Sequence, residues 1–229
     1  MRLWIANKNY SSWSLRPWVL MRELGIEFEE RLQPFGRNAD EIRELFRQFS
    51  PSGKVPCLQD GDITVWDSLA ITEYLAETHP AVWPLSREAR AWARSAAAEM
   101  HSGFTALRQH CSMTCGQRIT LRERPPELLT DLARLQELWS AGLARFGGPF
   151  LAGANFTAVD AFFAPVAFRL QSYQISLNEH CNAYRDRLLA LPAMREWYEA
   201  ALAEPWREAA HELDIAAGAS EIVDLRRPA

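Results

Sequence analysis

Lysine is nearly absent from this sequence: Lys8 and Lys54 are the only two in 229 residues, so arginine supplies almost all of the positive charge. The basic residues are scattered and the net charge is −4, which argues against a nucleic-acid partner. No run approaches the roughly 20 apolar residues of a membrane span. The first residues also lack the apolar run and cleavage site of a signal peptide. We therefore expect a cytoplasmic protein with no membrane partner.

Cysteine is also scarce, and its spacing excludes several kinds of site. Cys57, Cys111, Cys115 and Cys181 follow no disulfide-framework pattern, which favours a reducing compartment. Cys57 follows a proline in an apolar run and is expected to be a small core residue. His110 lies beside Cys111, but these residues close into no zinc pattern, so we expect no metal. The sequence has no Cys-x-x-Cys near its first predicted helix, so thioredoxin-type disulfide exchange is not expected.

The first 79 residues show the alternation of an α/β domain. Apolar runs and turn residues predict the order β-α-β-α-β-β-α, with the first two strands parallel through a right-handed crossover. The Asp60-Gly61 pair predicts a hairpin between the last two strands. The predicted strands are Arg2 to Ala6, Phe28 to Gln33, Val55 to Gln59 and Ile63 to Trp66, and the helices are one ending at Gly25, Asp40 to Phe49, and one beginning at Asp67-Ser68.

A proline-punctuated linker, His79 to Ser86, separates this part from a helical one. We expect domains at 1–79 and 87–229, the second all-α, with no strand after Trp66 and a loose tail from Ala216. Thr157 and Asp160 form a capping-box pattern and are expected to be structural. The predicted helices are Arg87 to about Cys115, Pro125 to Phe146, Ala158 to about Tyr173, Pro192 to Ala203, and a short one after Pro205.

The stretch from Ser50 to Pro80 carries the clearest indication of a binding site. A proline inside a strand, here Pro56, is typical of sheet edges or special positions, and an edge strand can hydrogen-bond an extended peptide. Asp67 and Ser68 are good N-cap residues, and a helix N-terminus can hold a carboxylate. Together these features predict a site for an extended, anionic, peptide-like ligand.

Four motifs carry a resemblance to a known family over nearly the whole chain. They are SSWSLR at the first helix, SGKVPCL, the WDS before the third helix, and LAGANFTAVDAFF. With these motifs, the chain resembles a cytosolic-type glutathione transferase. The resemblance implies a thioredoxin-like N-terminal domain, a helical C-terminal domain, a homodimer, and glutathione as co-substrate. The adjacent serines look most like the serine-type branches, which are zeta-like and related bacterial forms.

The resemblance also implies roles for the residues of the Ser50–Pro80 stretch. Val55 offers its backbone to the cysteinyl part of glutathione, and Pro56, if cis as in the family, turns that backbone outward. Ser68 and its backbone N–H take the γ-glutamyl carboxylate, and Asp67 balances the ammonium. Lys54 meets the glycyl carboxylate, although it could equally be a solvated loop lysine. Asp67 and Ser68 remain helix caps in either case.

The reactive end is expected at Ser11 or Ser12. A thiol titrates near pH 8.5, and lowering its pKa by about two units requires roughly 2.7 kcal/mol. A charge-assisted hydrogen bond plus a helix N-terminus can supply this. Serine-type enzymes place the catalytic hydroxyl here; Ser11 is preferred, although both serines could merely cap the helix. Tyr10 is an alternative donor, and Arg16 either structures the thiol site or forms a surface ion pair.

Three functions are compatible with these motifs. The first is a transferase that adds the glutathione thiolate to a small hydrophobic electrophile. The second is a glutathione-dependent isomerase, but Trp13 stands where zeta-like enzymes with a Ser-Ser-Cys motif carry cysteine, which puts maleylacetoacetate isomerase activity in doubt. The third is a non-catalytic binding scaffold, although the ligand-end residues are retained.

Overall fold

The structure, a computed structural model, describes residues 1–226 and begins with a four-stranded mixed sheet. The strands are β1 (Arg2–Ile5), β2 (Glu29–Leu32), β3 (Cys57–Asp60) and β4 (Ile63–Trp66), in the order β2-β1-β3-β4. β1 and β2 are parallel, and β3 is antiparallel to both β1 and β4. The predicted parallel pairing of the first two strands and the predicted hairpin are both confirmed, and the unit is the expected thioredoxin-like domain.

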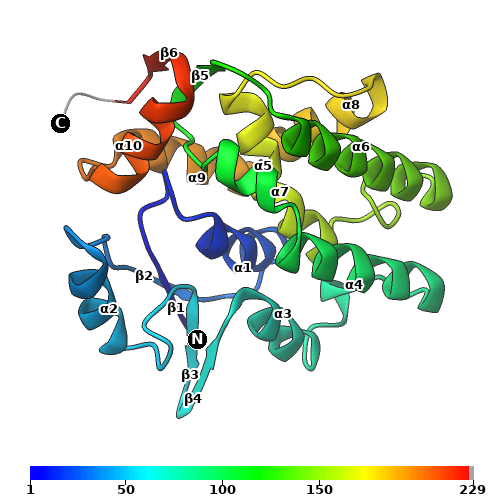
Figure 1. Cartoon of the computed structure of the whole chain (residues 1–229). Helices are drawn as coiled ribbons and strands as arrows, with labels where there is room; N and C mark the ends of the chain where they lie inside the picture. Colours follow the sequence, from blue (N-terminus) through cyan, green and yellow to red (C-terminus); the bar gives the residue numbers. More distant parts are fainter. Residues whose placement is uncertain (227–229) are drawn as a thin grey trace.

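Helices cover both faces of this sheet. They are α1 (Ser12–Glu23), α2 (Ala39–Arg47) and α3 (Ser68–Ala76). Side chains alternate along β1, so Leu3 and Ile5 join the core of α1 and α3, while Trp4 packs with Phe46 of α2 on the other face. Figure 1 shows α2 on one side of the sheet and α1 and α3 on the other. The N-terminus of α1 therefore points out of the domain toward the rest of the chain.

Of the two settings typical of a strand proline, a sheet edge and a special position, the structure excludes the edge for Pro56. β3 lies between β1 and β4, and Pro56 precedes its first residue, Cys57. The Val55–Pro56 peptide bond is cis, as the resemblance implied. Val55 lies outside the ladder, and its N–H and C=O make no hydrogen bond to any of residues 1–226. The site thus has free backbone groups at the start of an inner strand.

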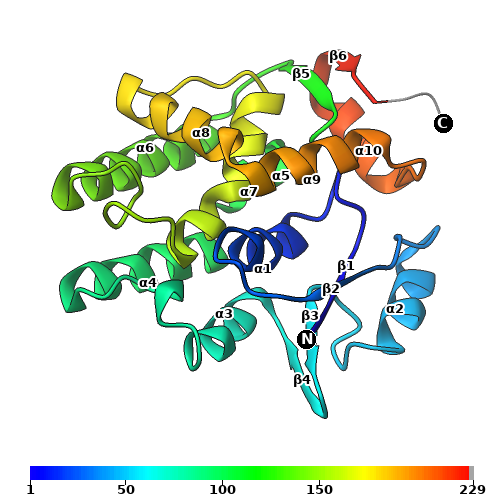
Figure 2. The same ribbon diagram turned by 180° about the vertical axis from the view of Figure 1, so that it is seen from behind.

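The helical half is built around one apolar helix, α7. All but one of its residues are buried, and it packs against α1, α4 and α8. Figure 2 shows α7 running between the sheet domain and the outer helices, so it joins the two halves. A one-turn 3₁₀ segment, η1 (Pro80–Val82), leads to the helices α4 (Arg87–Ser102), α5 (Thr105–His110), α6 (Pro126–Phe146), α7 (Ala158–Ser172), α8 (Glu179–Ala190), α9 (Pro192–Ala203) and α10 (Ala209–Gly218).

The helices of the second half differ from the prediction in two places. The single helix expected from Arg87 to about Cys115 is broken, because Gly103 is extended and Phe104 adopts a left-handed conformation with φ +52°. α5 then starts in a new direction. α8 was not predicted, although the side chain of its N-cap, Asn178, accepts a hydrogen bond from the backbone N–H of Cys181.

The expectation of a loose tail and of no strand after Trp66 is wrong. β5 (Gln117–Leu121) pairs antiparallel with β6 (Ala219–Asp224), although residues 227–229 of the predicted tail lie outside the described residues. Ile119 is fully buried in this ribbon. The ribbon lies next to the helices, and α10 and β6 lie above α1 in Figure 1.

Candidate functional site

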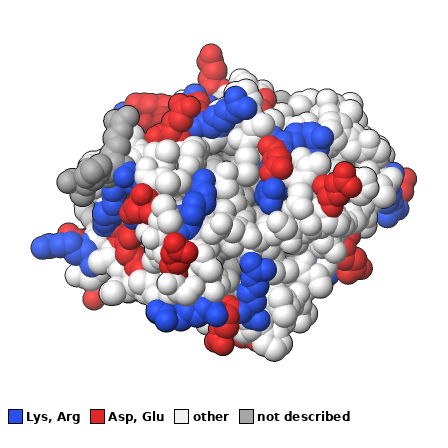
Figure 3. Space-filling view, turned by 90° about the horizontal axis from the view of Figure 1, so that it is seen from above, with Lys and Arg blue, Asp and Glu red and all other residues white. Residues whose placement is uncertain are grey.

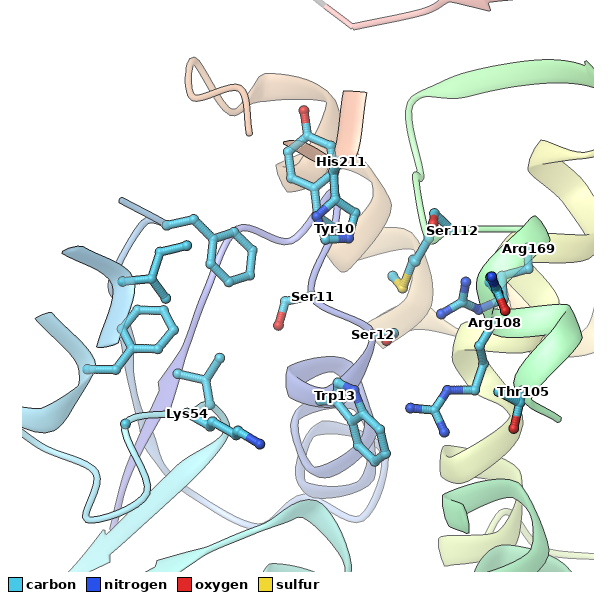
Figure 4. Close-up of a pocket in the computed structure, with 17 residues that line it drawn as sticks. Tyr10, Ser11, Ser12, Trp13, Lys54, Thr105, Arg108, Ser112, Arg169 and His211 are labelled. Carbon is cyan, nitrogen blue, oxygen red and sulfur yellow. The ribbon is translucent and has the colours of Figure 1, made fainter. Parts of the chain in front are cut away.

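A cavity of about 580 Å³ opens between the two halves, at the N-terminus of α1. Its walls come from the α1 loop, the α2 region, α5, α7 and α10, as Figure 4 shows. The lining residues are Tyr10, Ser11, Ser12, Trp13, Phe35, Ile42, Phe46, Gly53, Lys54, Val55, Thr105, Arg108, Gln109, Ser112, Met113, Arg169 and His211.

A second groove of about 560 Å³ adjoins this cavity. The two share Trp13, Lys54, Val55 and Arg108, so they form one continuous depression. The groove collects all five predicted glutathione-binding residues, and the cavity holds both serines. The groove residues are Trp13, Ser52, Lys54, Val55, Pro56, Trp66, Asp67, Ser68 and Arg108.

The two serines differ in surroundings. Ser11 is the N-cap of α1 and only 5% exposed, and its Oγ donates to Ser14 Oγ at 2.7 Å. Ser14 Oγ in turn accepts from the Ala6 N–H. Ser12 is half-buried, and its Oγ makes no hydrogen bond within residues 1–226. Figure 4 shows Ser11 on the Lys54 side of the cavity and Ser12 on the side of the helical half.

The loop that carries these serines is held by the helical half. Glu204, at the end of α9, accepts hydrogen bonds from the backbone N–H groups of Lys8 (2.6 Å) and Asn9 (3.2 Å). Asn9 Oδ1 accepts from the N–H groups of Cys115 and Gly116. Because these contacts join residues more than 100 positions apart, both halves of the chain fix the position of Ser11.

The start of α3 presents an unpaired buried hydroxyl. Asp67 has φ +75°, and its Oδ1 accepts the Leu69 N–H at 2.8 Å. Its Oδ2 lies 3.5 Å from His101 Nε2 on α4. Ser68 is 0% exposed, and its Oγ has no hydrogen-bond partner among residues 1–226. Buried polar groups are nearly always paired, so this orphaned hydroxyl fits a ligand group.

Arg16 is a buried cation and not a surface residue, so the interpretation as a surface ion pair is wrong. It is 2% exposed, and its guanidinium lies 4.1 Å from the Trp13 ring centroid and 5.0 Å from that of Phe162. Within the described part of the chain, its Nε and Nη1 have no hydrogen-bond partner. Burial, and then the charges of Arg108 and Arg169, lower the pKa of Arg16 to about 9. It therefore adds positive potential beneath Trp13.

Tyr10 has its hydroxyl engaged on the far side of its ring. The hydroxyl donates to Glu212 on α10 and accepts from Arg226 Nη1 at 2.7 Å. Burial, and then the Glu212 hydrogen bond, raise the pKa of Tyr10 to about 12. A neutral hydroxyl already paired with a carboxylate has no proton to offer a sulfur, so the geometry favours the serines over Tyr10 as thiol donors.

Sequence reasoning missed three charged or titratable residues of the cavity: Arg108, Arg169 and His211. They come from three different helices, so no local spacing joins them. Arg169 could have been noticed as a charge in an otherwise apolar helix. It is buried, its Nη1 donates to the Cys111 carbonyl, and its Nε is unpaired. Burial lowers the pKa of Arg169 to about 10.

All four cysteines are free and buried, and burial raises the pKa of Cys111 to about 12. Within residues 1–226 no group of His, Cys, Asp or Glu side chains is arranged to hold a metal ion. No helix of that range is long and apolar enough to cross a bilayer. On the face that Figure 3 shows, basic and acidic side chains are interspersed.

Comparison with known proteins gives two family matches. Residues 10–78 match the glutathione S-transferase N-terminal domain, and residues 90–200 match the C-terminal domain. The bovine glutathione S-transferase theta-1 is 29% identical over 218 residues, covering 90% of this chain and 86% of that protein. Dichloromethane dehalogenase from Methylophilus leisingeri is 41% identical, but over 59 residues only. This match spans 26% of the chain and 22% of the dehalogenase.

Solved structures show the same fold. A glutathione transferase homologue from Burkholderia BGR1 with bound glutathione has a TM-score of 0.65 and 23% identity, covering 87% of this chain and 97% of that one. Maleylacetoacetate isomerase from Methylobacterium extorquens AM1, with bound malonate and glutathione, has a TM-score of 0.64 and 24% identity, covering 90% and 98%. With both domain matches, in order and over most of its length, the chain belongs to the glutathione S-transferase family and is an enzyme of that family.

Proposed function

We propose that this enzyme adds the thiolate of glutathione to a small electrophile. Residues 1–79 bind glutathione, and the helical residues from 87 onward supply the acceptor pocket. The observation that carries the proposal is that the cavity and the groove are continuous. One holds the serines at the N-terminus of α1, and the other holds unpaired Val55 backbone groups and the orphaned Ser68 hydroxyl.

The residues of the groove match the parts of an extended tripeptide. The free N–H and C=O of Val55, ahead of Pro56, pair with the cysteinyl backbone. Ser68 Oγ and the N-terminus of α3 receive the γ-glutamyl carboxylate, since N–H groups and the helix dipole favour an anion there. Asp67 faces the ammonium, and Lys54, which lines both hollows, meets the glycyl carboxylate.

Ser11 is proposed as the donor to the sulfur. It lies on the Lys54 side of the cavity, where the cysteinyl part would be, and Ser12 faces the acceptor side (Figure 4). The Ser11 hydroxyl donates to Ser14 in this structure. A hydroxyl hydrogen can rotate, so it is free to turn toward a thiolate. The buried cation Arg16 and the α1 N-terminus add positive potential at the same place.

Titration of the bound thiol tests this assignment. In the wild type, the thiolate absorbance of bound glutathione should develop below the pH at which free glutathione ionises. Ser11→Ala should raise that midpoint by about one pH unit, the equivalent of one hydrogen bond of about 1.4 kcal/mol. Ser12→Ala is the matched control and should leave the midpoint in place. An unchanged midpoint in Ser11→Ala, or a shift in Ser12→Ala alone, would assign the role to the other serine or to neither.

A second candidate function is a glutathione-dependent isomerase of carboxylated alkenes. The observation that favours it is the presence of Arg108 and Arg169 in the cavity. Both guanidinium groups line the acceptor side of the cavity, where a substrate carboxylate would be paired. The structurally similar maleylacetoacetate isomerase was solved with malonate, a dicarboxylate. Trp13, in place of the cysteine of Ser-Ser-Cys enzymes, argues against it. Conversion of a maleyl compound to its fumaryl isomer without consumption of glutathione would support it.

We also propose a homodimer in the cytoplasm. β4 presents Ile63 and Trp66, which are 52% and 46% exposed, next to the α3 end of the groove. A second copy could cover these apolar side chains. Light scattering of the purified protein measures the mass, and a Trp66→Glu variant that becomes monomeric would place the interface here.

A further inference from the structure

His211 is a cavity residue that the binding roles leave unused. It lies on α10 and lines the same cavity as Ser11. Its imidazole is 5.4 Å from the Tyr10 ring and 6.3 Å from the Phe35 ring, centroid to centroid. Figure 4 shows this imidazole above Ser11, while the Tyr10 hydroxyl points away from the cavity. A titratable ring therefore closes the cavity above the predicted thiol position.

Glu208 fixes the tautomer of this histidine. Its Oε2 lies 2.9 Å from His211 Nδ1 and also accepts the His211 backbone N–H, as the N-cap of α10. A carboxylate can only accept, so Nδ1 carries a proton. Nε2 makes no hydrogen bond to any of residues 1–226. In the imidazolium form both ring nitrogens carry protons, so Nε2 can then donate a proton.

We propose that His211, held by Glu208, is the proton donor to acceptors that are alkenes conjugated to a carbonyl group. This inference rests on the proposed transferase function. The thiolate forms the S–C bond at the β-carbon, the C=C pair becomes an enolate, and the Nε2 proton goes to the α-carbon. Neutral His211 then regains a proton from solvent, which balances the proton that glutathione lost on ionisation.

The other charges of the cavity suit the same acceptor class. Arg108 and Arg169 lie on the wall formed by the helical half, so a carbonyl or carboxylate bound there would place the alkene between them and His211 (Figure 4). The enolate oxygen would be stabilised by these guanidinium groups as its charge develops. Substitution at an aryl halide releases halide and needs no proton donor, so it makes no use of His211.

The charged groups around the imidazole are few. Besides Glu208, they are the Glu212–Arg226 pair, which binds the hydroxyl of Tyr10, a neutral residue whose ring packs on the imidazole. Arg226 also pairs with Asp224. Removing His211 leaves this network intact, because none of its hydrogen bonds involves the imidazole. The variant therefore isolates the proton donor from the tail contacts.

Assays with two classes of acceptor distinguish a loss of proton donation from a general loss of substrate binding. His211→Gln, Glu208→Gln and the control His180→Gln, which replaces an exposed histidine of α8, are assayed with benzoylacrylate and with chlorodinitrobenzene. In His211→Gln, kcat/KM for benzoylacrylate should fall by about 10²-fold, the usual contribution of general acid catalysis. The value for chlorodinitrobenzene should change less than about threefold on the same reasoning. Glu208→Gln should show a smaller loss of the same kind, and His180→Gln none.

The activities with the two acceptors also distinguish failure of the proton-donor role from failure of the proposed transferase function. Retained benzoylacrylate addition in His211→Gln, or equal losses with both acceptors, would overturn the proton-donor role while leaving the transferase function standing. Absence of conjugation with either acceptor in the wild type would overturn both. Persistent chlorodinitrobenzene activity in His211→Gln shows that the variant is folded.

Discussion

Removing the Glu204 carboxylate should loosen the serine loop and destabilise the whole chain. Its two oxygens accept the backbone N–H groups of Lys8 and Asn9, which are both buried. In Glu204→Ala both donors lose their acceptor. A hydrogen bond to a charged group contributes about 1.5–3 kcal/mol, so the loss is about 3–6 kcal/mol. At about 2–4 °C per kcal/mol for a chain of this size, Tm should fall by about 6–24 °C.

Calorimetry at neutral pH measures this change, with two variants for comparison. Glu204→Gln keeps one acceptor but turns an amide N–H toward the other donor, so about half of the loss is expected. Glu199→Ala removes an exposed carboxylate from the same helix, α9, and should shift Tm by less than about 2 °C. Glutathione affinity should fall with Tm in the Glu204 variants, because Ser11 follows Asn9 by two residues. A Glu204→Ala protein that melts within about 2 °C of the wild type would refute the role given to this contact.

Three further outcomes follow from particular contacts. Tyr10→Phe should lose stability through its Glu212 bond but leave the midpoint of thiolate titration of bound glutathione unchanged, because the hydroxyl points away from the cavity. Gly142→Ala should cost about 1–3 kcal/mol in chemical denaturation, since an added Cβ would lie 2.7 Å from the Leu151 carbonyl oxygen. Native protein at pH 8 should not react with an aromatic disulfide, whereas four thiols should react after denaturation; burial raises the pKa of Cys111 to about 12, so its thiolate is scarce.

Local patterns predicted the sheet domain well because the residues within each of its elements are enough to indicate that element. The Asp60-Gly61 turn sets the β3–β4 hairpin, and Asp67 caps α3, so the boundaries there need no distant partner. The family resemblance supplied the glutathione-binding candidates, and in the structure they line one groove. The helices of the second half were likewise predicted from their own apolar spacing and cap residues.

The predictions that failed concern features that depend on residues far apart in the sequence. β5 is five residues long and becomes a strand because β6 pairs with it from about 100 positions away. The break after α4 depends on the positive φ of Phe104. A bulky residue rarely adopts this conformation, so the sequence around Phe104 does not predict it. Arg108, Arg169 and His211 meet only because α5, α7 and α10 converge on the cavity. Their joint chemistry is a property of the packed molecule.

The two lysines of this chain differ sharply in surroundings. Lys8 is buried, with its ammonium against Glu30 and the rings of Trp18 and Trp197. Lys54 is exposed and borders both hollows of the site. An amine-reactive fluorophore should therefore modify one side chain, Lys54, besides the terminal amine. This chemistry, usually unselective on protein surfaces, would here place a single reporter at the mouth of the site, where its emission could follow ligand entry directly.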